Sequence, residues 1–365
     1  GVTIPGTTVC GVPLAAAIGA FGGDPQKGLK TLEDITPQHV EMAQKLIANN
    51  AVDIAVEETP DFIHLDLTLS AGENCCRVVV KGTHTNVVEL YINGQPQPLS
   101  EKQNTRTQRE TLPTFSLQQA YDFINRVDFN DIRFILDAAR LNSALAAEGK
   151  TKKYGLNING TFSDAVKNGL MSNDLLSKVI INTVAASDAR MGGAPVVAMS
   201  NFGSGNQGIT ATMPVVVVAE HLGVDEETLA RALSLSHLTA ISIHSRYTRL
   251  SALCAASTAA MGAAAGMAWL FTRDINTINT AIINMVSDIT GMICDGASNS
   301  CAMKVSSVVS SAFKAVLMAM QNSCAGANDG IVCADVEQTI NNLCRLVIKP
   351  MTLTDKEIIS IMVAK

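Results

Sequence analysis

The chain has 365 residues, of which 47% are hydrophobic and only 16% are charged, and its formal net charge is −6. This composition excludes an intrinsically disordered protein. An acidic balance without a long basic run also argues against nucleic acid as a partner. At about 100–200 residues per domain, the length predicts two domains. The low charge indicates that some surface is buried between subunits, so we expect a homodimer.

The first third of the chain predicts a small α+β domain. Residues 39–49 have helical spacing, and four later runs have strand character. The expected strands are residues 52–57, 62–69, 76–81 and 87–92. Residues 101–113 are polar, charged and unpatterned, which is typical of a linker. We therefore expect an α+β domain at residues 1–112 and a larger, mainly α-helical domain at residues 113–365.

The rest of the chain has mostly helical patterns. Ser116, Asp128 and Asp225 each stand where a helix is expected to begin, and the pattern after Asp128 continues to residue 147. Residues 276–293 predict another helix. Thr354 and Glu357 form a capping-box pattern, which predicts the start of the last helix.

Two features bear on cellular location. Residues 250–271 carry no charge and are long enough to span a bilayer. Most of them are small, however, and small residues on every face suit a helix surrounded by other helices, so we expect no membrane span. Nine cysteines without a recognisable signal peptide do not resemble a secreted disulfide framework. A reducing cytoplasm is the expected location.

Residues 203–208 (GSGNQG) match the pattern G-x-G-x-x-G literally. We disfavour a dinucleotide site because Pro214 would break the helix that such a site requires. One remaining interpretation is a turn whose glycines serve backbone geometry. The other is an anion nest, in which backbone N–H groups such as that of Gly205 bind a carboxylate. Ser204, Asn206 and Gln207 would then add side-chain donors.

Two further motifs contain groups suited to substrate binding or proton transfer. Asp188 and Arg190 lie in an apolar region, where they would form a structural ion pair or let Arg190 bind a substrate carboxylate. His84 lies between two expected strands and is flanked by threonines, which suits either proton transfer or a solvated turn. His237 and His244 fall in a helical region, and we expect satisfied core or interface residues there.

Three cysteines lie in a segment that is otherwise poor in charge. Cys294 and Cys301 flank a glycine-containing loop, and Cys254 precedes them by 40 residues. They are either buried thiols or ligands that converge on a metal. Three cysteines, unlike the four ligands of structural zinc, would leave one iron of a cluster open for chemistry.

Four motifs together carry a family resemblance: MICDGASNSCAMK, SDARMGGA, SNFGSGNQGITATMP and KGTHTN. They resemble the family that contains the α chain of iron–sulfur L-serine dehydratases, and look most similar to its L-cysteine desulfidase branch. The resemblance extends over nearly the whole chain. It implies a lyase that works without pyridoxal phosphate and carries a [4Fe-4S] cluster, with Cys254, Cys294 and Cys301 as the cluster ligands. Members of this family normally begin with a segment carrying a Gly-Cys-Thr-Glu-Pro motif, and this chain starts after it.

The resemblance implies L-cysteine desulfidase activity, which yields pyruvate, ammonia and sulfide from a small amino-acid substrate. His84 is the expected base, and Arg190 with residues 203–208 would hold the carboxylate. Asn201 and Asp188 would support them. This model requires the three cysteines to converge and His84 to lie within about 15 Å of Cys294. The alternatives are an L-serine dehydratase and a non-catalytic iron–sulfur sensor or structural protein.

Overall fold

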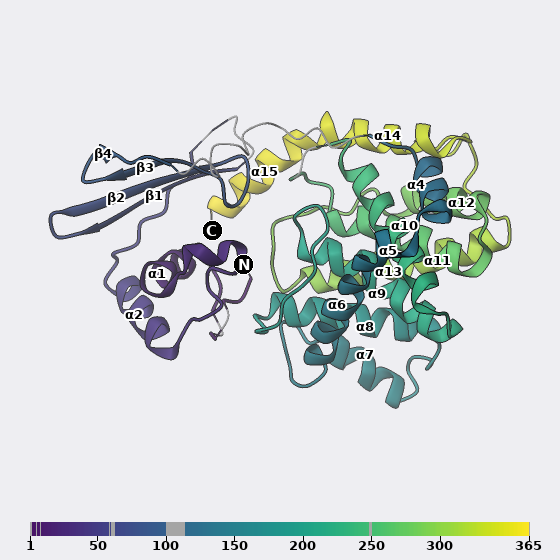
Figure 1. Ribbon diagram of the computed structural model, residues 1–365, viewed down its shortest axis with the longest axis horizontal. Coiled ribbons are helices and arrows are strands. Elements are labelled where there is room, and N and C mark those ends of the chain that lie inside the picture. Colours follow the sequence, from purple (N-terminus) through teal and green to yellow (C-terminus); the bar gives the residue numbers. More distant parts are fainter. Residues whose placement is uncertain are drawn as a thin grey trace. The chain divides into compact units, whose positions relative to one another are not determined.

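The computed structural model describes residues 2–4, 6–7, 9–57, 59, 63–99, 114–247 and 250–364. The chain divides into two compact units, Ile4–Pro113 and Thr114–Lys365, the second together with Gly1–Thr3. The smaller unit combines helices with an antiparallel sheet, and the larger unit is mainly helical (Figure 1). The predicted α+β class is therefore confirmed. The expected linker, residues 101–113, lies outside the described residues.

The smaller unit begins with two helices that share a small core. They are α1 (Val12–Gly22) and α2 (Pro37–Ala48), with a short 3-10 turn, η1 (Pro25–Lys30), between them. Thr36 caps α2, since its hydroxyl accepts a hydrogen bond from the His39 N–H at 3.4 Å. Leu14 and Ile18 of α1 are buried in the same cluster as Ala43 of α2. Apolar spacing along each helix thus places one face of each helix in this core.

The sheet of the smaller unit has four antiparallel strands in the order β1-β2-β3-β4. They are β1 (His64–Ala71), β2 (Asn74–Lys81), β3 (Val87–Ile92) and β4 (Gln95–Pro96). Asn93 and Gly94, both with positive φ, join β3 to β4 as the sequence suggests. The expected strand at residues 52–57 is wrong. Those residues are without regular structure, because they pair with no strand of this sheet.

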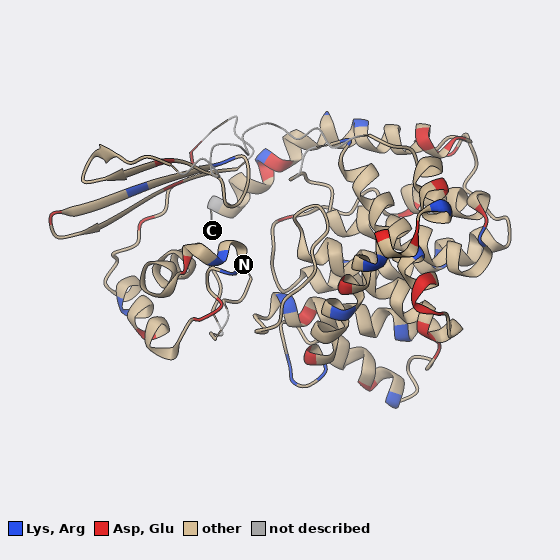
Figure 2. Ribbon diagram, viewed as in Figure 1, with Lys and Arg blue, Asp and Glu red and all other residues tan. Residues whose placement is uncertain are grey.

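The larger unit is built around helix α11 (Ala255–Thr272), which carries no charged residue (Figure 2). The other helices of this unit are α4 (Leu117–Arg126), α5 (Phe129–Ile132), α6 (Leu136–Gly149), α7 (Ile158–Lys167), α8 (Leu175–Met191), α9 (Gly205–Leu222), α10 (Glu226–His244), α12 (Ile275–Ile289), α13 (Cys301–Met320), α14 (Val336–Ile348) and α15 (Met351–Val363). Helices α9, α10, α12 and α13 all pack against α11. The small residues that argued against a membrane span are buried among these helices.

Three sequence expectations about helices are wrong in detail. Helix α9 continues through Pro214, so the argument that this proline ends the helix fails. The helix is buried along most of its length, and packing on all sides outweighs the local cost of proline. The last helix starts at Met351, which places Thr354 inside it rather than at its cap. The pattern after Asp128 is divided into α5, a 3-10 turn η2 (Arg133–Ile135) and α6.

Among the described helices, α13 alone has the length and apolar composition to cross a membrane. Half of its apolar stretch is buried inside the protein. A buried core helix has the same composition, so this feature is weak evidence for a membrane span.

The close approach of α10 and α11 gives a test of the core. A Cβ on Gly262 of α11 would lie 2.3 Å from the Ser236 carbonyl oxygen of α10, which is too close for any real contact. We expect Gly262→Ala to lower the free energy of unfolding by about 1–3 kcal/mol, since the helices must move apart. Urea unfolding followed by circular dichroism measures this. Gly291→Ala is the control, because a Cβ there meets no atom within 4 Å; equal stability of the two variants would contradict the packing argument.

Candidate functional site

Two of the three cysteines lie side by side because two short extended segments pair next to them. Leu253 and Ile293 form an antiparallel bridge. On either side of it the Cys254 N–H donates to the Met292 carbonyl at 3.0 Å, and the Cys294 N–H donates to the Ala252 carbonyl at 2.7 Å. Residues 40 positions apart in the sequence are thereby held together by main-chain hydrogen bonds.

The two thiols share a hydrogen bond, and this separates their acidities. Cys254 donates to the Cys294 sulfur, which lowers the pKa of Cys294 and raises that of Cys254. The Gly296 N–H and the Lys304 ammonium lower the pKa of Cys294 further, against the effect of burial. Lys304 also forms an ion pair with Asp295. The sequence analysis missed Lys304, although a lysine three residues after Cys301 in a charge-poor segment is a visible signal.

The third cysteine stands at the first position of α13. The Cys301 thiol donates to the Gly296 carbonyl at 3.5 Å and accepts from the Ser298 N–H at 3.4 Å. Gly296 therefore contacts Cys294 through its N–H and Cys301 through its carbonyl. All three cysteines border the loop of residues 294–301.

The donor set of this loop suits a thiolate-bound metal cluster. Within the described part of the chain, no group of three His, Cys, Asp or Glu residues is placed to hold a single metal ion. A four-iron cluster is wider than one ion and takes cysteine sulfur as its ligand. Three thiols, together with the positive charge of Lys304 beside two of them, fit such a group in their chemistry.

Arg190 lies at the last turn of α8, directly against the first residue of α9. A Cβ on Gly205 would come within 2.2 Å of the Arg190 Nε atom, so any larger residue there would displace the guanidinium. The guanidinium is largely buried, and burial lowers the pKa of Arg190, whereas the nearby Cys301 raises it. Among the described residues its hydrogen-bond acceptor is the Met191 sulfur, at 3.0 Å. Of the two interpretations offered by the sequence, the ion pair with Asp188 is not formed, since Asp188 accepts from Asn159 and Arg190 has no carboxylate partner among the described residues.

Residues 203–208 form a turn followed by the start of a helix. Asn201 and Ser204 exchange two main-chain hydrogen bonds across Phe202 and Gly203, both of which have positive φ. The Ser204 hydroxyl then caps α9 by accepting from the Gln207 N–H at 3.3 Å. The N–H groups of Gly205 and Asn206 have no acceptor among the described residues. These two donors at a helix N-terminus, next to a guanidinium, make an anion-binding surface.

The side chains of Asn206 and Gln207 already have hydrogen-bond partners within the protein. Asn206 accepts from the Ser187 hydroxyl at 3.3 Å and donates to the Met191 sulfur at 3.4 Å. Gln207 donates to the Asn201 oxygen at 2.9 Å and accepts from His244 at 2.8 Å. Asn206 and Gln207 thus already have partners for their side chains, whereas the Ser204 hydroxyl accepts from the Gln207 N–H and keeps its own O–H as a donor.

Asp188 faces helix α7 rather than Arg190. Its Oδ2 atom accepts from the Asn159 N–H at 2.9 Å and from the Asn159 side chain at 3.1 Å. The Ile158 N–H lies close enough to interact as well. A carboxylate at the N-terminus of a helix is stabilised by the helix dipole. Burial nevertheless raises the pKa of Asp188, because these hydrogen bonds do not fully replace water.

A buried chain of hydrogen bonds continues from Gln207 to His237. The Asn201 amide donates to His237 Nδ1 at 3.0 Å, so the proton of that ring is on Nε2, which donates to the Thr212 hydroxyl at 3.0 Å. The Thr212 hydroxyl in turn donates to the Gly208 carbonyl at 2.7 Å. Burial lowers the pKa of His237 to about 4, which keeps the ring neutral. His237 is therefore a satisfied core residue, as the sequence suggested, and it supports the first turn of α9.

His244 is also buried, at the end of α10. Its ring stacks between Phe202 and Tyr247, with ring centroids 4.4 and 4.6 Å away. His84 lies in the smaller unit, exposed in the loop between β2 and β3. The loop position agrees with the sequence analysis, and the pairing of His84 with the cysteines stays a prediction.

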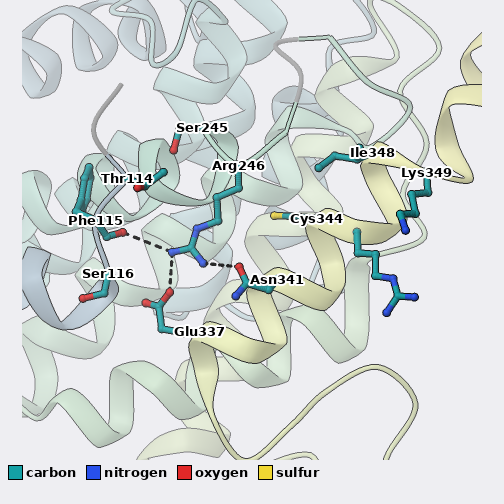
Figure 3. Close-up of a pocket in the computed structure, with 11 residues that line it drawn as sticks. Thr114, Phe115, Ser116, Ser245, Arg246, Glu337, Asn341, Cys344, Ile348 and Lys349 are labelled. Carbon is teal, nitrogen blue, oxygen red and sulfur yellow. Dashed lines mark hydrogen bonds and ion pairs between the residues drawn. The ribbon is translucent and has the colours of Figure 1, made fainter. Parts of the chain in front are cut away.

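A cavity of about 810 Å³ lies elsewhere in the larger unit (Figure 3). Its wall includes the start of α4, the end of α10 and one side of α14. Arg246 in this wall donates to Glu337 at 2.6 Å and to Asn341 at 3.0 Å, so its charge is already paired. None of the predicted site residues lines this cavity. The chemistry-bearing residues instead gather at the ends of α8, α9, α11 and α13.

The neutral state of His237 predicts how stability depends on pH. An unfolded chain protonates histidine near pH 6.5, whereas the folded chain does so only near pH 4. Between these values the unfolded state binds the extra proton, so stability falls as the pH falls from about 6.5 to 4, by about 3 kcal/mol at most. Urea unfolding from pH 5 to 8 should show this slope in the wild type and a flatter one in His237→Gln. Identical slopes would mean that His237 is protonated in the folded state.

The acidities of the cysteines predict their order of reaction in metal-free protein. Because its pKa is lowered, Cys294 should be carbamidomethylated by iodoacetamide at pH 7 faster than Cys254. Cys344 is the internal control, since burial raises its pKa to about 11 and keeps it a thiol. Short pulses followed by peptide mass spectrometry measure the three rates. A faster reaction at Cys254 would reverse the assignment of donor and acceptor in the thiol pair.

Comparison with known proteins places this site in a family. The family model described as "Serine dehydratase alpha chain" matches residues 26–360. The UPF0597 protein YhaM of Escherichia coli K12 is 51% identical over 370 residues, covering all of this chain and 85% of its own length. The UPF0597 protein YhaM of Salmonella typhi is 50% identical over 371 residues with the same coverage. The chain belongs to the serine dehydratase alpha-chain family.

Proposed function

We propose that this protein is an iron–sulfur-dependent lyase that eliminates sulfide from L-cysteine without pyridoxal phosphate. One observation carries the proposal. The largely buried Arg190 guanidinium lies over the N-terminus of α9, has no carboxylate partner in the described chain, and is close to Cys301. The family supports a dehydratase-like activity, and Arg190 supports a substrate with a carboxylate.

The energetics of Arg190 favour a ligand at this place. A buried charge without a partner is strongly unfavourable unless an anion completes the site. A thioether is a weak acceptor, so Met191 does not compensate for the lost water. A substrate carboxylate would accept a bidentate pair of hydrogen bonds from the Arg190 guanidinium, the geometry that suits arginine. It would also accept hydrogen bonds from the N–H groups of Gly205 and Asn206.

The cysteine loop supports the rest of the assignment. Cys254, Cys294 and Cys301 would hold a [4Fe-4S] cluster, whose ligands must be thiolates, and the lowered pKa of Cys294 favours that state. When bound, such a cluster with three protein ligands offers an open iron that acts as a Lewis acid on the β-sulfur or β-hydroxyl. Arg190 lies beside Cys301, so a carboxylate bound there would be next to the cluster ligands.

The reaction breaks two bonds of the substrate. A base, for which His84 is our candidate, removes the α-proton, and the electron pair of the Cα–H bond forms the Cα=Cβ double bond. The Cβ–S bond breaks and sulfide leaves with its electron pair. The aminoacrylate product takes up water and yields pyruvate and ammonia. In this scheme Arg190 and the first turn of α9 hold the carboxylate still while the α-proton leaves.

A second candidate is the same elimination on L-serine, with water as the leaving group. The family description favours it directly. A non-catalytic iron–sulfur sensor is the third interpretation, and the anion-binding surface around Arg190 argues against it, since a sensor has no need for it. We also propose a cytoplasmic homodimer; the nine cysteines are all free thiols, as in a reducing compartment.

The test separates substrate binding from metal binding. Arg190→Lys keeps the charge but loses the planar fork, so we expect KM for cysteine and serine to rise at least tenfold while the visible absorbance of the cluster is retained. Cys301→Ser should remove the absorbance and the activity together. Pyruvate release from anaerobically reconstituted, full-length protein is the measurement.

Arg140→Lys is the matched control, because Arg140 is exposed and paired with Asp137 at 3.1 Å. This variant should leave KM for cysteine and KM for serine unchanged. If Arg190→Lys behaves like this control, Arg190 does not bind the substrate. If reconstituted wild-type protein forms pyruvate from neither amino acid, the proposed lyase activity is wrong.

A further inference from the structure

Two buried oxygen atoms, one on helix α8 and one in the cysteine loop, lack hydrogen-bond donors. They are Oδ1 of Asp188 and Oδ1 of Asn299, and neither has a partner among the described residues. Buried polar atoms in folded proteins are nearly always paired, so each such atom requires an explanation. Both belong to segments that carry site residues, since Asp188 precedes Arg190 by two positions and Asn299 precedes Cys301 by two.

The two residues meet at Gly155, just before helix α7. The Asn299 Oδ1 atom lies 3.2 Å from the position that a Cβ on Gly155 would take, and the Asp188 carbonyl oxygen lies 3.3 Å from the same point. The other carboxylate oxygen of Asp188 is held by Asn159, four residues further on. The Asn299 side chain and the last turn of α8 therefore approach the same short stretch of chain.

The two unpartnered oxygens favour a positively charged hydrogen-bond donor. A carboxylate oxygen and an amide oxygen only accept hydrogen bonds, so each of them requires a donor. Among the described residues no cation pairs with the Asp188 carboxylate, and the Arg190 guanidinium lies against Gly205 instead. An ammonium group has three donors and a full positive charge, so it can donate to a carboxylate oxygen and to an amide oxygen.

We infer that Asp188 and Asn299 bind the α-ammonium group of the substrate and so select 2-amino acids over acids that lack the amine. The inference rests on the proposed function, because it assumes that the carboxylate is held at Arg190. In an amino acid the ammonium and carboxylate groups are attached to the same carbon. The site offers the matching arrangement, with Arg190 for the carboxylate and two acceptor oxygens on the adjoining segments.

Two ligands that differ only in the amine test this inference. L-Alanine and propionate both carry the carboxylate, and neither has a β-leaving group, so binding can be measured by calorimetry without turnover. We expect Asn299→Leu to weaken L-alanine binding about tenfold, as for a lost hydrogen bond to a charged group, and to change propionate binding less than twofold. Asn299→Asp keeps an acceptor oxygen and should restore the preference for L-alanine.

Asn279→Leu is the matched control. Its Oδ1 atom is likewise buried and unpartnered, but it lies near the start of α12, away from the cysteine loop. This variant should bind both ligands as the wild type does. If Asn299→Leu does not fold, Asp188→Asn replaces it, since the amide oxygen can still accept from Asn159 while the charge is lost; it too should weaken L-alanine alone.

The outcomes are distinct. Equal weakening of both ligands by Asn299→Leu, or no change in either, would overturn the inference and leave a buried water as the partner of these oxygens. Wild-type protein that binds L-alanine no better than propionate would also overturn it. Failure of the proposed lyase activity would give a different result. L-Alanine binding would still depend on the amine and on Asn299, but no pyruvate would form from cysteine or serine.

Discussion

The site depends on where four buried helices end. Helix α11 is made of small residues, so its neighbours approach it closely, and at Gly262 the contact with α10 is made by backbone atoms. Such packing leaves no room for side-chain chemistry along the helices and confines it to their termini. Cys254 precedes α11, Cys301 begins α13, Gly205 begins α9 and Arg190 closes α8. The geometry of the candidate site is thus a consequence of how the core packs.

The polarity of these helix ends matches the charges proposed for them. The N-termini of α9, α11 and α13 present partial positive charge, which favours a carboxylate and thiolates. The Ala256 N–H at the start of α11, for example, lowers the pKa of Cys254 against the larger effects of burial and Cys294. The C-terminus of α8 presents partial negative charge near Asp188. Main-chain dipoles therefore divide the region into a part that favours anions and a part that favours a cation.

Much of this was visible in the sequence, and the misses have physical causes. The glycine motif, Arg190 and the three cysteines were found because unusual residue types in an apolar segment need a reason to be there. The other partners of Asn206 and Gln207 were not visible, because a sequence does not show that their side chains bond Met191 and His244. The prediction that Pro214 breaks its helix was wrong for another reason, since the rule on proline in helices describes exposed helices better than buried ones.

The contact between Arg190 and Met191 has a consequence for the speed and strength of binding. The Met191 sulfur is buried and holds Arg190 at 3.0 Å and Asn206 at 3.4 Å. A weak acceptor of this kind fixes the rotamer of a long side chain without competing strongly for its donors. The carboxylate proposed to bind here would then replace a weak contact instead of a salt bridge, and the guanidinium would lose little side-chain entropy. In the proposed function, Met191 would thus keep Arg190 oriented before the substrate carboxylate binds.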